Sequence, residues 1–208
     1  MKRRQFIKRV SAAAAIVATS LTPVATFAAN TYRRFTQRYL RPPGSMKEKE
    51  FLETCIRCGQ CGEACPNDCI KYFGYENGVD SVDTPCITPR EKACILCMKC
   101  GDVCPTGAIK KVERDAAIIL KEVDMGHARV DELLCLSFQG KTCGVCYRAC
   151  PLQDIAITIG MLEQPHVTDL CVGCGLCERS CIQIPQAIKV MPRQMNIQHS
   201  KSVVQYHE

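Results

Sequence analysis

The chain of 208 residues contains eighteen cysteines, but only 6% of its residues are aromatic and it has no tryptophan. So many cysteines with so few large side chains argue against a domain held together by an ordinary hydrophobic core. Disulfides, zinc or iron–sulfur clusters are the remaining stabilising elements. The net charge is +6, but five of these charges lie in residues 1–28, on Lys2, Arg3, Arg4, Lys8 and Arg9. The remainder is nearly neutral, so we expect no nucleic-acid partner.

The first segment, residues 1–29, resembles a twin-arginine signal peptide. Arg3 and Arg4 are followed by a large apolar residue, by Lys8 and by an alanine-rich stretch that ends in small residues, where a signal peptidase could cleave. Such a signal engages the twin-arginine translocase, which exports folded proteins. It predicts a periplasmic protein whose cofactors are inserted before export. The alternatives are a signal that stays uncleaved and an N-terminal membrane anchor.

Residues 30–49 form a basic linker in this interpretation. A Ser45-x-x-Glu48 pattern predicts a capping box and a short helix from about Met46. The linker could be a solvated spacer, or its basic side chains could contact anionic headgroups at the membrane surface or a protein partner. These basic side chains are Arg33, Arg34, Arg38, Arg41 and Lys47.

One cysteine pattern occurs four times along the chain. Three cysteines spaced by two residues are followed by a fourth after three more, and in the first three runs by a proline. The third run is stretched, because seven residues separate its first two cysteines, and the fourth run has Ile182 in place of the proline. The runs are Cys55, Cys58, Cys61 and Cys65; Cys94, Cys97, Cys100 and Cys104; Cys135, Cys143, Cys146 and Cys150; and Cys171, Cys174, Cys177 and Cys181.

This spacing is that of bacterial ferredoxins, in which one tight loop presents three thiolates to a [4Fe–4S] cluster and the fourth thiolate binds the cluster of a paired run. Sixteen of the eighteen cysteines therefore predict four [4Fe–4S] clusters. Glycines beside the ligands would let backbone N–H groups approach the cluster sulfur atoms, which helps to set the reduction potential. These glycines are Gly59, Gly62, Gly101, Gly144, Gly173 and Gly175.

A short strand-forming segment follows each run. These segments are residues 69–72, 108–112, 155–159 and 187–190. Between the second and third runs, apolar residues recur at helical spacing over residues 116–123, with a stop near Gly126. The repeating unit of cluster loop, turn and strand predicts an α+β, bacterial ferredoxin-like fold, in which four cluster-binding runs form two paired dicluster units. We expect this unit to span residues 50–192 and a polar tail to follow at 193–208.

Other interpretations of the cysteines fit less well. Zinc ribbons use two separated pairs of cysteines, and consecutive two-residue spacings leave disulfides without well-separated partners. No C-x-x-C is followed by His, which excludes c-type haem by this test. The chain has no nucleotide- or flavin-binding motif and its four histidines are scattered, so we expect an electron-transfer protein rather than an enzyme. Outside the runs, Cys69 predicts a small buried residue behind the first cluster loop, whereas Cys86 could be buried or exposed.

With these residues the chain resembles the NapG/MauM family of exported ferredoxin-type proteins over almost its full length. The resemblance rests on the twin-arginine start, on the Arg-Pro-Pro-Gly sequence that begins at Arg41 and, most specifically, on the stretched third run from Cys135 to Pro151. Generic ferredoxins lack the seven-residue spacer of that run. The second run has plain spacing, whereas NapG-type proteins often carry a longer gap there. The choice between NapG-type, which we favour, and MauM-type stays open.

The resemblance implies a carrier that passes electrons from a membrane quinol-oxidising ferredoxin-type partner toward a periplasmic reductase system. For NapG-type members that system is periplasmic nitrate reductase, and for MauM-type members it is methylamine utilisation. Two other classes stay open, namely the four-cluster electron-transfer subunit of a molybdopterin oxidoreductase complex and a maturation factor for a reductase. The export signal favours an independent carrier, because such subunits usually travel with a catalytic partner.

The spacing allows two pairings of the runs: first with second and third with fourth, or first with fourth and second with third. Resemblance to larger four-cluster subunits favours the second, nested arrangement. It predicts that Cys65 binds the cluster of Cys171, Cys174 and Cys177, and that Cys181 completes that of Cys55, Cys58 and Cys61. By the same rule Cys104 joins Cys135, Cys143 and Cys146, and Cys150 joins Cys94, Cys97 and Cys100. The first and last runs would then lie at one end of one folded unit.

Overall fold

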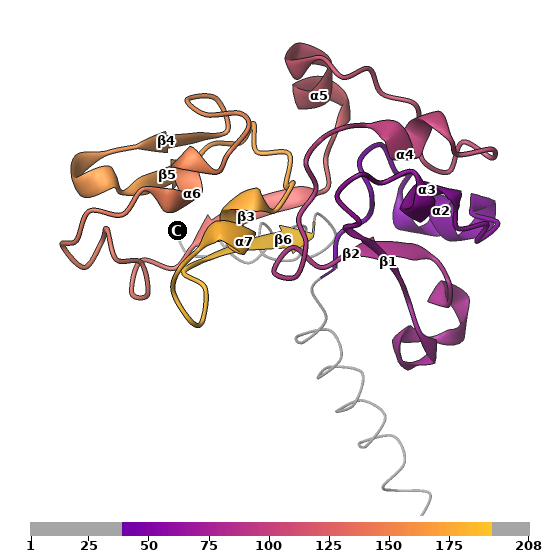
Figure 1. Ribbon diagram of the computed structural model, residues 1–208, viewed down its shortest axis with the longest axis horizontal. Coiled ribbons are helices and arrows are strands. Elements are labelled where there is room, and N and C mark those ends of the chain that lie inside the picture. The colour runs from indigo at the N-terminus through magenta and orange to yellow at the C-terminus, as the bar shows by residue number, and fades with distance from the viewer. Residues whose placement is uncertain (1–38, 193–208) are drawn as a thin grey trace, which may run out of the picture. The chain divides into compact units, whose positions relative to one another are not determined.

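The computed structural model describes residues 39–192, which all belong to one compact unit (Figure 1). The predicted signal peptide (1–29), residues 30–38 of the predicted linker and the predicted tail (193–208) lie outside the described residues. Among the helices of residues 39–192, none is long and apolar enough to cross a membrane. Two halves of similar plan make up the described chain: an N-terminal half, residues 39–112, and a C-terminal half, residues 125–192.

The N-terminal half carries the first two runs on short helices. Its elements in chain order are α2 (Glu48–Thr54), α3 (Gln60–Glu63), β1 (Ile70–Tyr72), η1 (Tyr75–Asn77), η2 (Val79–Ser81), β2 (Pro85–Ile87) and α4 (Lys99–Asp102). Strands β1 and β2 pair antiparallel and lead the chain from the first run back to the second. Helix α3 of the first run packs on α4 of the second, so these two runs lie against each other.

The C-terminal half repeats this plan and adds a longer strand pair. Its elements are β3 (Gly126–Val130), α6 (Val145–Arg148), β4 (Ile157–Ile159), η3 (Met161–Glu163), β5 (Pro165–Val167), α7 (Leu176–Ser180) and β6 (Ile188–Pro192). Strands β4 and β5 pair antiparallel between the third and fourth runs, and α6 packs on α7. Strand β3 pairs antiparallel with β6, with Gly126 opposite Pro192 and Val130 opposite Ile188. This pair closes the half by joining its first and last strands.

Helix α5 (Ala116–Glu122) connects the two halves, which confirms the helix predicted over residues 116–123. It begins after Asp115, whose side chain accepts hydrogen bonds from the N–H groups of Ala117 and Ile118 at 2.9 and 3.1 Å. This is an N-cap, which satisfies backbone donors that have no partner within the helix. Ile119 is the buried residue of α5 and anchors the helix to the core.

Three of the four predicted strand segments form strands, namely β1, β4 and β6. The remaining segment, residues 108–112, forms only an isolated antiparallel bridge between Ile109 and Ser45. The mixture of short helices and strands confirms the α+β class. The predicted capping box is wrong: no side chain caps α2, and the Ser45 hydroxyl donates to the carbonyl oxygen of Pro42 at 2.7 Å. The reason is that Glu48, the other member of the box, is engaged by Arg41.

Arg41 is buried in the N-terminal half, although the sequence placed it in the basic linker. Its guanidinium forms a two-point ion pair with Glu48, at 2.5 and 2.9 Å, and donates at 2.9 Å to the hydroxyl of Thr84. It also lies 4.7 Å from the ring centre of Phe51 and 5.0 Å from that of Phe73, within the range of cation–π attraction. Arg41 therefore holds the fold together, and the expectation that it contacts headgroups or a partner is wrong.

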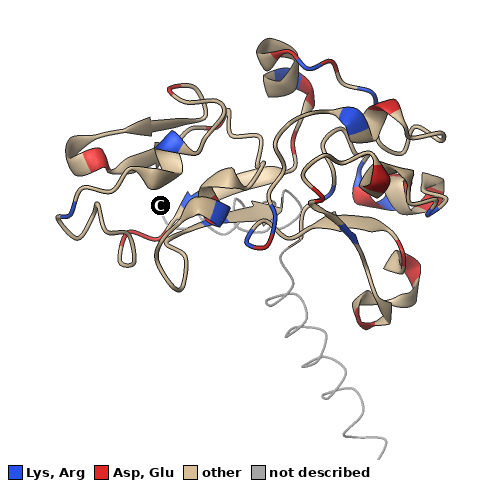
Figure 2. Ribbon diagram, in the orientation of Figure 1, with Lys and Arg blue, Asp and Glu red and all other residues tan. Residues whose placement is uncertain are grey.

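Charged side chains of both signs are interspersed along both halves (Figure 2). Several form exposed ion pairs, such as Lys92 with Asp68 at 2.5 Å and Lys111 with Asp102 at 3.4 Å. Exposed pairs of this kind each contribute about 0–1 kcal/mol. Exposed ion pairs therefore contribute little to the stability of the fold, and most of it must come from the core.

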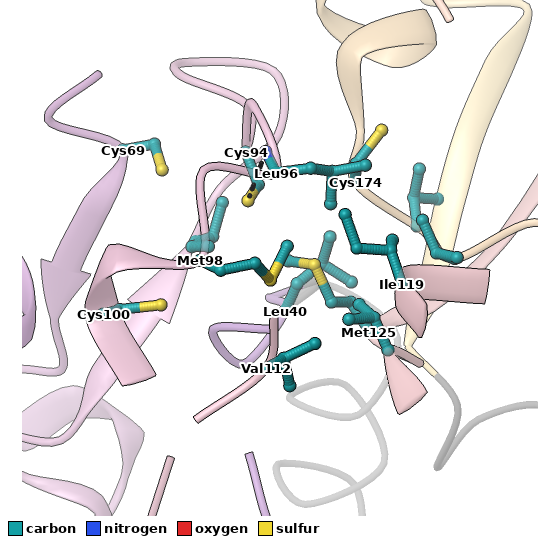
Figure 3. Packing of buried hydrophobic residues seen from close by; sticks show 14 of the residues in the cluster. Leu40, Cys69, Cys94, Leu96, Met98, Cys100, Val112, Ile119, Met125 and Cys174 are labelled. Atoms are coloured by element: carbon teal, nitrogen blue, oxygen red, sulfur yellow. Dashed lines mark hydrogen bonds between the residues drawn. The ribbon is translucent and has the colours of Figure 1, made fainter. Parts of the chain in front are cut away.

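Cysteine thiols and aliphatic side chains share one core. Figure 3 shows Cys94, Cys100 and Cys174 among aliphatic side chains such as Ile119. Phe51 is the aromatic member of this buried cluster in the described part of the chain. Because so many of the buried side chains are thiols, the packing of the core depends on what the thiols bind.

Candidate metal centres

The sixteen cysteines of the four runs line four cavities, with four run cysteines in each. We number each cavity by the run that supplies three of its cysteines. The first cavity is lined by Cys55, Cys58, Cys61 and Cys104, the second by Cys65, Cys94, Cys97 and Cys100, the third by Cys135, Cys143, Cys146 and Cys181, and the fourth by Cys150, Cys171, Cys174 and Cys177. Each predicted ligand thus shares a cavity with three others.

The nested pairing expected from the sequence is wrong. Cys65 lines the second cavity and Cys104 the first, so the first two runs exchange their fourth cysteines. The last two runs exchange Cys150 and Cys181 in the same way. The physical reason is the strand pair inside each half, because β1–β2 and β4–β5 return the chain to the run it has just left. The first and last runs therefore share no cavity.

Left-handed backbone shapes the loops of three runs. The residues on either side of the second cysteine have positive φ, and these are Arg57 and Gly59, Leu96 and Met98, and Gly173 and Gly175. Such residues turn neighbouring N–H groups toward one concave side, an arrangement that binds anions and iron–sulfur clusters. The thiol of Cys94 accepts from the N–H of Leu96, and that of Cys104 from the N–H of Ile109, each at 3.4 Å. The loops thus present N–H donors to sulfur.

Two of the glycines beside ligands serve packing as well as sulfur contact. A Cβ on Gly62 would lie 2.2 Å from the hydroxyl oxygen of Tyr72, and one on Gly101 would lie 2.3 Å from the carbonyl oxygen of Lys110. Both glycines are in the short helices that follow the cluster loops and let these helices approach the segment that follows the run. Their N–H groups also bond to the thiols of Cys61 and Cys100, as the sequence predicted.

The stretched third run reaches the same four-cysteine arrangement by another route. Its spacer turns tightly, with the N–H groups of Phe138 and Gln139 both donating to the carbonyl oxygen of Cys135 at 3.1 Å. Gly140 in the spacer and Gly144 after the second cysteine are its left-handed residues. Ser137, in the same spacer, is 1% exposed and lines the third cavity. Its hydroxyl has no hydrogen-bond partner among the described residues, so the cavity contains a buried donor with nothing to bind.

Burial makes the thiolate form of several cavity cysteines less favourable than in a free cysteine. It raises the pKa of Cys61 and Cys146 to about 11, and that of Cys100 and Cys174 to about 12. Cys104 is the exception, since burial is outweighed there by the N–H of Ile109 and the hydroxyl of Thr106, which lower its pKa. Four thiolates can share such a cavity only with a cationic group that displaces their protons.

This donor set fits a [4Fe–4S] cluster better than a single ion. In residues 39–192, no three Cys, His, Asp or Glu side chains converge on a point that one metal ion could occupy. A cubane is bound at its corners, so its thiolates stand apart around a cavity. All eighteen thiols are free. Four separated thiols, N–H donors aimed at sulfur and an unpaired buried hydroxyl together match what a cluster needs from its protein.

The two cysteines outside the runs differ in their surroundings. Cys69 is buried behind the first cluster loop, as predicted, but it also lines the second cavity, where its sulfur lies 3.5 Å from that of Cys65. Cys86 is buried in β2, which decides between the two alternatives for this residue. The spacing of Cys69, four residues after a ligand, did not reveal that it joins the neighbouring run's cavity, because that depends on the pairing of the runs.

Two family models match the cysteine runs. The 4Fe-4S dicluster domain matches residues 54–108 and 93–154, and the 4Fe-4S binding domain matches residues 168–181. The match over residues 54–108 spans the first and second runs and the match over 93–154 spans the second and third, so the cavities and not the family model identify which runs exchange cysteines. Fold, cavities and family models together define a ferredoxin-type iron–sulfur protein that binds 4Fe-4S clusters.

Comparison with similar proteins identifies the family to which the chain belongs within this class. The methylamine utilization ferredoxin-type protein MauM of Methylorubrum extorquens is 37% identical over 168 residues, which cover 76% of this chain and 74% of that protein. The ferredoxin-type protein NapG of Escherichia coli K12 is 37% identical over 165 residues, covering 74% and 70%. MauM of Paracoccus denitrificans is 33% identical over 170 residues, covering 77% and 74%. The chain belongs to the NapG/MauM family and is a ferredoxin-type electron-transfer protein.

Proposed function

We propose that each cavity holds one [4Fe–4S] cluster on its four run cysteines, and that the protein relays electrons through four clusters. The observation that carries this proposal is the exchange of Cys65 with Cys104 and of Cys150 with Cys181 between neighbouring cavities. The same exchange builds a two-cluster ferredoxin. The bound clusters supply one-electron chemistry, and the chain supplies thiolates, N–H donors and burial that tune it.

Metal content tests this proposal. Protein purified without oxygen should contain about sixteen iron atoms per chain and a matching amount of sulfide, because each cluster holds four irons on four cysteines. Zinc as the dominant metal, with little iron, would overturn the proposal. Iron and zinc are measured in the same sample, so their amounts per chain can be compared directly.

The carrier works in the periplasm in this proposal, and the twin-arginine translocase exports it with its clusters already bound. The support is the Arg3-Arg4 pair with the alanine-rich stretch behind it. Replacing Arg3 and Arg4 by Lys should leave the loaded protein in the cytoplasm, whereas replacing Lys8 by Arg should not. Normal export of the double variant would contradict the proposed route. A high-salt wash of the membranes tests whether the exported protein is held at the surface by charge.

The electrons come from a membrane quinol-oxidising ferredoxin-type protein and go toward periplasmic nitrate reductase in the version that we favour. The support is the NapG protein of Escherichia coli, which is 37% identical. The second candidate is methylamine utilisation, which is favoured by equally similar MauM relatives and by the plain spacing of the second run.

Disruption of the gene in its own host separates these candidates. Loss of quinol-dependent nitrate reduction, with unchanged growth on methylamine, supports the first, and the reverse result supports the second. Purification of the chain in a fixed ratio with one catalytic partner would contradict an independent carrier and favour a subunit of an oxidoreductase complex. The gene with Cys55 and Cys94 replaced by Ala serves as the control for a chain without clusters in the first and second cavities.

A further inference from the structure

The two halves meet where the second run faces the fourth. The backbone N–H of Cys94 donates a hydrogen bond of 3.0 Å to the carbonyl oxygen of Cys174. Cys94 lines the second cavity and Cys174 the fourth, and they are only 4% and 7% exposed. Figure 3 shows Cys94 and Leu96 beside Cys174 at this junction. A few covalent bonds and one hydrogen bond therefore connect a cavity thiol of one half with a cavity thiol of the other.

Arg90, which precedes the second run, clamps this junction. Its guanidinium donates to three carbonyl oxygens at the end of α7, of which that of Cys181 is the nearest at 3.0 Å. A cation is favoured at this end of a helix, where carbonyl groups lack partners. Beside Arg90, Pro89 approaches Gly175 so closely that a Cβ on Gly175 would lie 2.6 Å from the proline Cβ. The loop before the second run is thus docked on the fourth run.

We propose that electrons cross between the halves at the Cys94–Cys174 hydrogen bond, with Arg90 as the positioning residue that holds this contact. The proposal rests on the proposed function, in which the four cavities hold clusters. Exchanged cysteines already connect the first cavity to the second and the third to the fourth. The junction therefore orders the cavities in series as first, second, fourth and third. At each crossing a reduced cluster loses one electron and its oxidised neighbour gains it, and no proton or covalent bond changes.

The cavities at the two ends of this series have the most exposed large apolar side chains in their linings. Ile56 lines the first cavity and Ile182 the third, and each is 61% exposed. Cys58 of the first cavity is also exposed. A donor and an acceptor can thus reach opposite ends of the series, while the junction between the second and fourth cavities stays buried. This arrangement is what a relay between two partners requires.

Arg90→Ala tests the proposal, with Lys92→Ala as the matched control. Lys92 lies in the same loop as Arg90, but its ion pair with Asp68, at 2.5 Å, stays within the N-terminal half. In the loaded full chain, Arg90→Ala should keep its iron, exchange the Cys94 amide hydrogen faster and weaken the magnetic interaction between reduced clusters across the junction. Electron equilibration between the halves after a pulse of reductant should slow several-fold. Lys92→Ala should change none of these readouts.

Two other outcomes of this experiment would each overturn one part of the proposal. Faster exchange at Cys94 with an undiminished equilibration rate would overturn the path, and unchanged exchange would overturn the role of Arg90. If Arg90→Ala loses iron, Arg90→Lys takes its place with the same readouts, because lysine keeps the charge but lacks the planar guanidinium that reaches three carbonyl oxygens. Wild-type protein with fewer than four clusters would instead contradict the proposed function, so the two failures are distinguishable.

A second observation, independent of the junction, is the unpaired hydroxyl of Ser137 in the third cavity. A buried hydroxyl without a partner costs about 1–3 kcal/mol, so a partner inside the cavity is expected. No serine lines the other three cavities. We infer that Ser137 donates a hydrogen bond to sulfur of the cluster in the third cavity. Since a donor stabilises the more negative reduced form, Ser137 raises the reduction potential at this end of the series.

Ser137→Ala and Ser137→Thr separate the hydroxyl from the size of the side chain. In redox titrations of the loaded protein, Ala should lower one cluster potential by about 59 mV, which corresponds to a tenfold change for one electron. Thr should retain the wild-type potential, as should the control Ser45→Ala, whose hydroxyl already bonds to Pro42. If Ala loses the cluster, Thr must keep it. Equal behaviour of the Ala and Thr variants would overturn the inference.

Discussion

The two halves of this molecule solve one problem with different residues. Both place two cysteine runs against each other and exchange the fourth cysteine, yet the C-terminal half is closed by the β3–β6 pair. The N-terminal half has only the bridge between Ser45 and Ile109 at the corresponding place. There, Arg41 ties the start of the fold to β2, because its guanidinium donates to the hydroxyl of Thr84 and the carbonyl oxygen of Pro85 while it is paired with Glu48. The arrangement of the cysteines is thus the same in both halves, whereas the contacts that support it differ.

The cluster loops differ in the same sense. The fourth run uses Gly173 and Gly175 at its left-handed positions, where a Cβ would overlap with neighbouring atoms. The second run places Leu96 and Met98 at the equivalent positions, and both side chains are buried. Left-handed backbone costs a residue with a side chain about 1–2 kcal/mol, and burial of a large apolar side chain offsets this cost. Both runs therefore share the loop conformation, whereas glycine is needed only in the fourth run, where neighbouring atoms leave no room for a Cβ.

Removal of the clusters should have the largest effect on stability. Both halves should then lose their structure, whatever contacts support each of them. With thiols throughout the shared core, cluster ligation supplies much of the folding free energy, as in other metal-dependent domains. Chelation under oxidising conditions should therefore eliminate most ordered structure, measured by circular dichroism and amide exchange. A cooperative unfolding transition in the iron-free protein would contradict this, and order kept in one half would show that its support is sufficient without clusters.

Loss of Arg41 should destabilise the loaded protein next most strongly. Arg41→Ala removes a partly buried two-point ion pair with Glu48 together with the contacts of the guanidinium with Phe51 and Phe73, which should cost about 3 kcal/mol. The thermal midpoint should fall by roughly 2–4 °C for each kcal/mol in a protein of this size. Lys111→Ala is the control, because it removes an exposed ion pair with Asp102 of the same half. Equal effects of the two variants would mean that Arg41 does not close the N-terminal half.

Two glycine substitutions should lower stability by smaller amounts, and the loss should differ between the two halves. Gly59→Ala meets only the Tyr72 hydroxyl at 3.7 Å and should cost the left-handed strain alone, about 1 kcal/mol. Gly173→Ala would place its Cβ 2.5 Å from the carbonyl oxygen of Gly126 in β3, so it should cost about 3 kcal/mol. Thermal midpoints of the two loaded variants test this order. A milder effect at Gly173 would show that β3 can move away.

The sequence was sufficient to locate the sites but not to connect them. The run spacing identifies sixteen of the seventeen cysteines that line the cavities, all but Cys69, and apolar periodicity predicts α5, because both signals are local. The pairing of the runs depends on where the β1–β2 and β4–β5 pairs send the chain, and short strands leave no long-range signal in the sequence. Arg41 was misassigned for a related reason: its partners, Thr84 and the carbonyl of Pro85, lie more than forty residues away.

Iron content of a double variant tests the central claim most directly, namely that neighbouring runs exchange their fourth cysteines around four clusters. Cys55 and Cys104 belong to different runs but to one cavity. Replacing both by Ala should therefore remove one cluster and leave about twelve of about sixteen irons per chain. Cys65→Ala with Cys104→Ala, which touches two cavities, should leave about eight. A Cys55/Cys104 variant that retains only about eight irons would contradict the account, because the two residues would then serve separate clusters.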